Sequence, residues 1–272
     1  MSYRLDDLLY LMARLRDPQY GCPWDLEQSF ETIVPHTLEE AYEVADAIAE
    51  GDFRQLAGEL GDLLFQVVYY AQLGREAGHF GWDEVVDGIT RKLVRRHPHV
   101  FPDGNLRTPP GTLNLPQEQI KRRWEEIKAE ERAERTDAPE QLSLLDDIPK
   151  ALPALSRAQK LQGRAARAGF DWPDTLPVID KLAEELDEIR QAIALGDQAA
   201  VAEEVGDLLF CTVNLARHLK VDAETALRAG NDKFERRFRF IEQQLSEGGR
   251  GVEQCSLQEL DALWDEAKRQ GL

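Results

Sequence analysis

Apolar residues recur along most of the chain at the three- and four-residue spacing of one face of an α-helix, and alternating, strand-like runs are few. One such stripe covers residues 182–193 and is expected to end at Gly196. Helices are also predicted over about 199–219, 223–245 and 257–269. The first of these three is apolar on so many sides that we expect it to be buried. The pattern predicts an all-α protein.

The central part of the chain is repeated without a gap. The segment GELGDLLF at residues 58–65 recurs as EEVGDLLF at 203–210, so that Glu204 follows Glu59 by 145 residues. Two glutamates upstream of the first copy recur at the same offset. Four acidic residues therefore repeat in register, which indicates two copies of one structural unit.

A charged segment with several prolines separates the two copies, as is typical of a linker. The length of 272 residues also favours two compact units. We predict two tandem bundles of four or five helices each. They are expected at residues 1–130 and 150–272, joined by the linker 131–149.

Composition and charge limit which binding partners and which cellular compartment are expected for the protein. The formal net charge of -18 opposes generic attraction to nucleic acid or to an anionic membrane. The most apolar segment, 63–73, is far shorter than the roughly 20 residues that span a bilayer. The acidic start is unlike a signal peptide, and the three cysteines are far apart. These features predict a cytoplasmic protein with reduced thiols and with neither a nucleic-acid polymer nor a membrane as its partner.

Paired carboxylates are the candidate chemistry. Glu185 with Glu188, and Glu204 with Asp207, are each three residues apart and share a helix face. Glu204 falls inside an apolar stripe, where unpaired carboxylates are costly and repel one another. A hard divalent cation, Mg²⁺ or Mn²⁺, would remove both problems. A ferritin-like di-iron site is the rival interpretation, but it needs Glu-x-x-His, and the i+3 residues here are acids.

Basic and aromatic residues further along complement these acids. Lys233 and Arg237 are one helical turn apart and suit phosphate oxygens, although a KFERR run on its own is more often a solvated surface. Trp264 and Lys268 are also one turn apart, and the indole could stack on a nucleobase or simply pack in the core. A Mg²⁺-polyphosphate ligand would explain both groups.

Several motifs together resemble the tandem-domain MazG nucleoside triphosphate pyrophosphohydrolases: GCPWD at 21–25, EExxE at 39–43, GELGDLLFQVV, RRHPHVF, NLARH and KFERRF. The resemblance covers nearly the whole chain. It implies an all-α fold, usually dimeric, that hydrolyses NTPs and dNTPs to a monophosphate and pyrophosphate with Mg²⁺ and broad base tolerance. It also implies a house-cleaning role in nucleotide pools and a link to nutritional stress.

The resemblance also implies site residues at matching positions. The second half would hold the metal with its four acids and the substrate with its basic and aromatic residues. One departure is that Ala200 and Val201 stand where the family has a lysine. The implied second-half residues are Glu185, Glu188, Glu204 and Asp207 for the metal, and Lys233, Arg237, Trp264 and Lys268 for the substrate. The first-half copies are Glu40, Glu43, Glu59 and Asp62, with Lys92, Arg96, Trp124 and Lys128.

An enzyme of this kind would use the metal to neutralise phosphate charge and to lower the pKa of a bound water. Glu185 or its neighbour Glu184 could then accept the proton. The alternative is a sensor that binds Mg-nucleotide without turnover and acts through its dimer. A purely structural scaffold would leave the buried acids unexplained.

The two halves are not expected to be equivalent. Asn214 lies two turns after Asp207 on the same face, where its amide could bind substrate, but the first half has Tyr69 there. Asn231 stands two residues before Lys233, where the first half has Thr90. The second half is therefore predicted to perform most of the chemistry.

Overall fold

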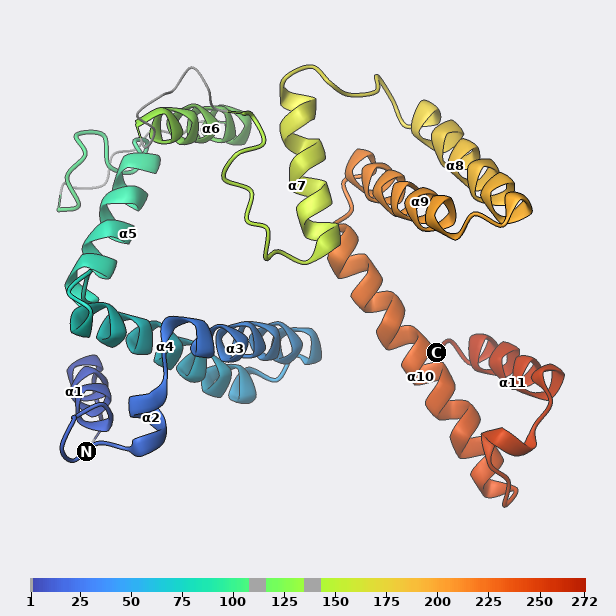
Figure 1. Cartoon of the computed structure of the whole chain (residues 1–272), viewed down its shortest axis with the longest axis horizontal. Helices are drawn as coiled ribbons and strands as arrows, with labels where there is room; N and C mark the ends of the chain where they lie inside the picture. Colours follow the sequence, from blue (N-terminus) through green and yellow to red (C-terminus); the bar gives the residue numbers. More distant parts are fainter. Residues whose placement is uncertain (1, 108–115, 135–142) are drawn as a thin grey trace. The chain divides into compact units, whose positions relative to one another are not determined.

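The computed structural model describes residues 2–107, 116–134 and 143–272, and every regular element in these segments is a helix (Figure 1). The predicted all-α fold is therefore confirmed for the described chain. The chain divides into two compact units, Met1–Asp137 and Ala138–Leu272. Their division falls inside the segment predicted as a linker, of which residues 135–142 lie outside the described part.

The first unit is organised around a helical hairpin. α3 and α4 lie side by side (Figure 1). The turn between them uses Gly51 in the left-handed region, with φ of 72°. Asp52 caps α4 by accepting hydrogen bonds from two backbone N–H groups. α1 packs on α4, α4 on α5, and α5 on α6. The helices are α1 Leu5–Leu15, α2 Pro23–Glu27, α3 Phe30–Glu50, α4 Phe53–Glu76, α5 Trp82–Arg96 and α6 Gln117–Glu134.

The second unit repeats this hairpin with the same turn chemistry. Gly196 ends α8 with φ of 69°, and Asp197 caps α9 through the N–H groups of Ala199 and Ala200. The long helix α10 contacts α7, α9 and α11. The helices are α7 Ala154–Arg167, α8 Leu176–Leu195, α9 Gln198–His218, α10 Ala223–Glu247 and α11 Leu257–Arg269, with a short 3₁₀ turn at Val252–Gln254.

One expectation is wrong in part. α9 is not buried on all sides, because Val205, Leu209 and Phe210 are each exposed to more than a third. α9 packs on α8, α7 and α10, which leaves these side chains partly exposed. The helix α6 continues to Glu134, and Glu131 near its end is buried. No helix of the described segments is both long and apolar enough to cross a membrane.

Candidate metal and phosphate site

Three carboxylates from two adjacent helices meet in the second unit. Glu185 and Glu188 lie three residues apart on α8, and Glu204 faces them from the first half of α9. One carboxylate oxygen from each of the three lies within 4.8 Å of the others. The hairpin turn brings the two helices together in the register that makes this contact, so the acids converge although the sequence separates them.

Burial and mutual repulsion act on these three acids. Glu185 is buried, with only 3% of its surface exposed, and the other two are half-buried. Partial burial and the charges of Glu188 and Glu185 raise the pKa of Glu204. The Oε2 atom of Glu185 is buried and has no hydrogen-bond partner among the residues that the structure describes. An uncompensated buried carboxylate oxygen is costly, so this atom is a candidate to bind a cation.

Lys181, which sequence reasoning missed, reaches the same acids. Its Nζ atom lies 2.9 Å from Oε1 of Glu185, 2.8 Å from Glu184 and 3.9 Å from Glu188. The hydrogen bonds to Glu184 and Glu185 raise the pKa of Lys181. Its position one turn before Glu185 on the same helix was the available signal. A single lysine offsets only part of the charge of the acids.

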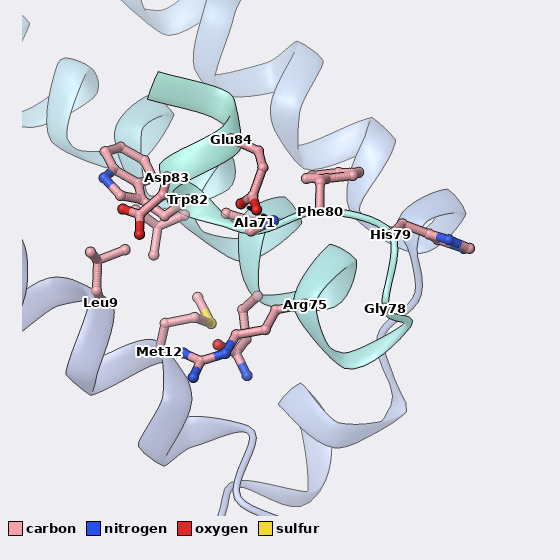
Figure 2. Close-up of a pocket in the computed structure, with 13 residues that line it drawn as sticks. Leu9, Met12, Ala71, Arg75, Gly78, His79, Phe80, Trp82, Asp83 and Glu84 are labelled. Carbon is pink, nitrogen blue, oxygen red and sulfur yellow. Dashed lines mark hydrogen bonds between the residues drawn. The ribbon is translucent and has the colours of Figure 1, made fainter. Parts of the chain in front are cut away.

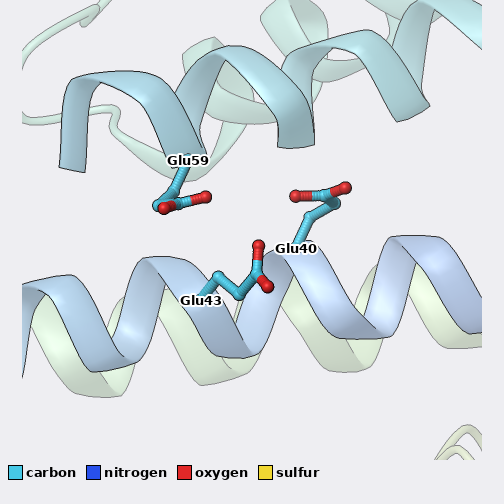
Figure 3. A group of neighbouring side chains, drawn as sticks. All are labelled: Glu40, Glu43 and Glu59. Carbon is cyan, nitrogen blue, oxygen red and sulfur yellow. The ribbon is translucent and has the colours of Figure 1, made fainter. Parts of the chain in front are cut away.

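The first unit contains the same arrangement. Glu40 and Glu43 on α3 and Glu59 on α4 point toward one another across the hairpin, with ligand atoms again within 4.8 Å (Figure 3). Partial burial and the charges of Glu59 and Glu40 raise the pKa of Glu43. His36 occupies the position of Lys181, and its Nδ1 atom lies 3.8 Å from Glu39. The two acid groups are thus alike in geometry and differ in the adjacent base.

The fourth predicted acid of each half stands apart from the other three. Asp62 and Asp207 are exposed and lie outside the two groups of converging carboxylates. The expectation of a buried set holds in full only for Glu185. The other acids are half-buried (Glu40, Glu59, Glu188 and Glu204) or exposed (Glu43, Asp62 and Asp207).

Comparison with known proteins identifies the family. The family model described as the MazG nucleotide pyrophosphohydrolase domain matches residues 28–101 and again 175–239, once in each unit. The chain belongs to the MazG nucleotide pyrophosphohydrolase family. It is 52% identical over 98% of both chains to the nucleoside triphosphate pyrophosphohydrolase of Escherichia coli K12. It is 40% identical to the nucleoside triphosphate pyrophosphohydrolase/pyrophosphatase MazG of Thermotoga maritima, over 97% of this chain and 95% of that protein.

Membership in the MazG family confirms three predictions made from the sequence: the family itself, the tandem all-α architecture and the class of enzyme. The chain is a hydrolase that acts on nucleotide anhydrides. Both acid groups lie inside the two segments that match the family model, whereas Trp124 and Trp264 lie outside them.

The basic residues of the second unit form a separate group on α10 and α11. The Arg237 guanidinium lies 5.3 Å from the ring centre of Trp264, and its Nε atom donates a 2.7 Å hydrogen bond to the main-chain oxygen of Leu272. Phe234 packs against the same indole, so Trp264 is partly a packing residue. Lys233 and Lys268 are exposed, and Lys268 pairs with Asp265. Across the described chain, no ion pair or hydrogen bond joins this group to the α8–α9 acids.

The basic residues of the first unit are more strongly engaged. Arg96 on α5 forms an ion pair with Glu131 on α6, at 2.5 Å between Nη2 and Oε2. Lys128 lies over the ring of Trp124, 4.8 Å from its centre. Lys92 is exposed on α5. The predicted phosphate-binding arginine of this unit therefore already binds a carboxylate, which the motif alone did not indicate.

The two predicted asparagines differ in environment. Asn214 is buried, and its Oδ1 atom accepts hydrogen bonds from Nε and Nη2 of Arg217, at 3.0 and 2.8 Å. Arg217 in turn pairs with Asp171. Asn231 is exposed on α10. In the first unit, the buried hydroxyl of Tyr69 donates to the main-chain oxygen of Asp25 at 2.9 Å. The acceptor oxygen of Asn214 is therefore used within the fold.

The first unit also contains a pocket of about 560 Å³, and Figure 2 shows the residues that line it. Met12 and Val68 line its apolar part, and Arg75, Asp83 and Glu84 add charged groups. None of the predicted site residues lines this pocket, so it is separate from the candidate metal site.

Proposed function

We propose that the chain hydrolyses nucleoside triphosphates, NTPs and dNTPs alike, to the nucleoside monophosphate and pyrophosphate with Mg²⁺ or Mn²⁺. The observation that carries this proposal is the convergence of Glu185, Glu188 and Glu204, with a buried oxygen of Glu185 that lacks a partner within the described residues. The names of the full-length relatives from E. coli and T. maritima support the choice of substrate.

The donor set fits a hard divalent cation. All three converging ligands are carboxylate oxygens, which suit Mg²⁺ and Mn²⁺ and not a soft metal. Asp207, one turn beyond Glu204 on α9, would complete the four acids after a change of side-chain rotamer. The bound ion would supply charge neutralisation at the phosphates and a more acidic water. Glu40, Glu43, Glu59 and Asp62 would hold the ion of the first unit in the same way.

The other residues would bind and orient the substrate. Lys233 and Arg237 carry positive charges one turn apart on α10, which match the oxygens of a phosphate chain. The indole of Trp264 would stack on the base, and stacking tolerates any base because it does not read hydrogen-bond patterns. Glu184 or Glu185 would accept the proton of the attacking water, since Glu185 belongs to the acid group and Glu184 shares the contact with Lys181 beside it. Asn231 and Lys268 would add polar contacts.

We further propose a cytoplasmic homodimer that removes unwanted nucleotides from the pool, including under nutritional stress. The uncovered apolar side chains of α9, among them Leu209 and Phe210, support a dimer because soluble proteins seldom leave such a face exposed. The net charge of -18 supports small-molecule substrates in place of nucleic acid or membrane.

The test is product analysis with Mg²⁺ and each NTP and dNTP in turn, followed by ³¹P NMR. Monophosphate and pyrophosphate are expected as the first products in every case. Diphosphate and orthophosphate would refute the proposal, and so would a lack of turnover with every triphosphate. The Glu126→Gln variant is the matched control, because Glu126 is exposed on α6 and lies outside both acid groups.

A further inference from the structure

The phosphate-binding arginine predicted in the first unit is held by a buried acid. Nη2 of Arg96 lies 2.5 Å from Oε2 of Glu131, and Nε lies 3.2 Å from both carboxylate oxygens. The two side chains are only 14% and 10% exposed. Both residues belong to helices, α5 and α6, that pack against each other. The pair is therefore fixed by the fold.

The neighbouring arginine is engaged in the same manner. Arg95 donates to both oxygens of Glu134, at 2.6 and 2.7 Å. Glu131 and Glu134, which are three residues apart on α6, thus face the adjacent Arg96 and Arg95 of α5. A forked contact of this kind uses the same N–H groups that would bind a phosphate. Because Arg96 and Glu131 are both largely buried, a phosphate that displaced Glu131 would have to break a largely buried ion pair, which is strongly unfavourable.

Among the described residues of the second unit, no acidic side chain stands at the matching place. Trp124 and Lys128 of α6 correspond to Trp264 and Lys268 of α11, so the counterpart of Glu131 is Gly271, which has no side chain. Arg237, the counterpart of Arg96, donates instead to the main-chain oxygen of Leu272, beyond the end of α11. One face of its guanidinium lies on Trp264. The acidic side chain at this place is thus a feature of the first unit.

We propose that Glu131 takes the place of a substrate phosphate on Arg96 and thereby keeps the first unit from binding a nucleoside triphosphate. Glu131 is a specificity-determining residue that restricts triphosphate binding to the second unit. This inference rests on the proposed function. It predicts one triphosphate per chain, although both units contain a group of three converging carboxylates.

Binding stoichiometry tests the inference. The full-length protein is titrated calorimetrically, with Mg²⁺ present, with an ATP analogue whose α–β bridge is a methylene group. We expect one site per chain in the native protein and two in Glu131→Gln, whose amide keeps a hydrogen-bond acceptor for Arg96 but removes the negative charge. Glu131→Ser, which also opens space beside Arg96, is the second variant and should likewise gain a site.

Two control variants distinguish a general loss of negative charge from the specific release of Arg96. Glu126→Gln removes one negative charge from the exposed side of the same helix and should keep one site. The double variant Arg96→Gln/Glu131→Gln also removes the guanidinium that would bind the phosphate, and it should keep one site. Its circular-dichroism spectrum should be like that of the native protein. Two equivalent sites in the native protein would overturn the inference and leave the proposed function intact. A folded Glu131→Gln and a folded Glu131→Ser that both keep one site would also overturn it. Absence of binding in the native protein would refute the proposed function itself.

Discussion

Lys181 and Glu185 form an ion pair within one turn of α8, with Nζ 2.9 Å from Oε1. Glu185 is the buried acid of the candidate metal site. The lysine supplies one positive charge where three carboxylates converge. The second oxygen of Glu185 still lacks a partner in the described part of the chain. The protein alone therefore leaves this site short of positive charge, and stability and activity should both respond to a divalent cation.

Stability without metal should increase as the solution is acidified from neutral pH. Glu204 has a pKa raised above its ordinary value of 4.5, so the folded state binds a proton more readily than the unfolded state does. A raised pKa of an acid stabilises the fold at low pH, and that stabilisation is lost as pH rises through the folded-state pKa. Thermal unfolding in EDTA from pH 7 down toward 5 should show a rising midpoint. Glu204→Gln should show a smaller rise, and an equal rise would contradict the assignment.

Removal of one acid of the second unit should abolish metal-dependent turnover without unfolding the chain. We expect Glu185→Gln to lower hydrolysis by about 100-fold or more, because a ligand is lost at the position where substrate must be aligned. The fold should persist, since the substitution removes a repelling charge. Asp207→Asn should behave similarly if Asp207 joins the metal. Full activity in either variant, measured by pyrophosphate release, would refute its role as a ligand.

Helix boundaries were predictable because the signals are local. The stripe at 182–193 and the Gly196-Asp197 pair placed the end of α8 correctly, since glycine and a capping aspartate act on the adjacent backbone. The burial of α9 was not predictable in the same way. Its apolar sides predict packing against other side chains, but Leu209 and Phe210 remain 53% and 44% exposed. Periodicity does not distinguish a core contact from a contact with a second molecule.

The acid groups were predictable in part because the repeat identified the same positions twice. Glu185, Glu188 and Glu204 converge as the hairpin requires. Two contacts were missed for different reasons. Lys181 reaches Glu185 from one turn away on the same helix, a spacing that the sequence does contain. Glu131 meets Arg96 across two helices that 35 residues of sequence separate. That pair depends on how the helices pack, which a pattern along one helix does not specify.

The uncovered apolar face of α9 predicts a homodimer in solution. Light scattering at micromolar concentration should give twice the 30.9 kDa mass of one chain. Phe210→Glu places a charge on this face, at a side chain that is already exposed in the chain, and should therefore shift the mass toward one chain while helicity is kept. Leu195→Glu is a suitable control, because Leu195 is exposed at the end of α8, beside the hairpin turn. A monomeric native protein would contradict the prediction.

The two acid groups should contribute unequally to turnover, although their geometry is alike. In the first unit Arg96 is bound to Glu131, and Tyr69 stands at the position of Asn214 with its hydroxyl bonded to Asp25. Poor positioning of a substrate can cost about 100-fold in rate even where the metal ligands are present. Glu204→Gln should therefore remove most hydrolysis, and Glu59→Gln should leave most of it.

The two variants are matched, because Glu59 and Glu204 lie at equivalent positions on α4 and α9. Each of these helices begins at an aspartate cap, and both glutamates are half-buried. Initial rates of pyrophosphate release with Mg²⁺ are measured for both variants and for the native protein. The reverse pattern would assign the chemistry to the first unit, and equal losses would indicate that both units turn over substrate.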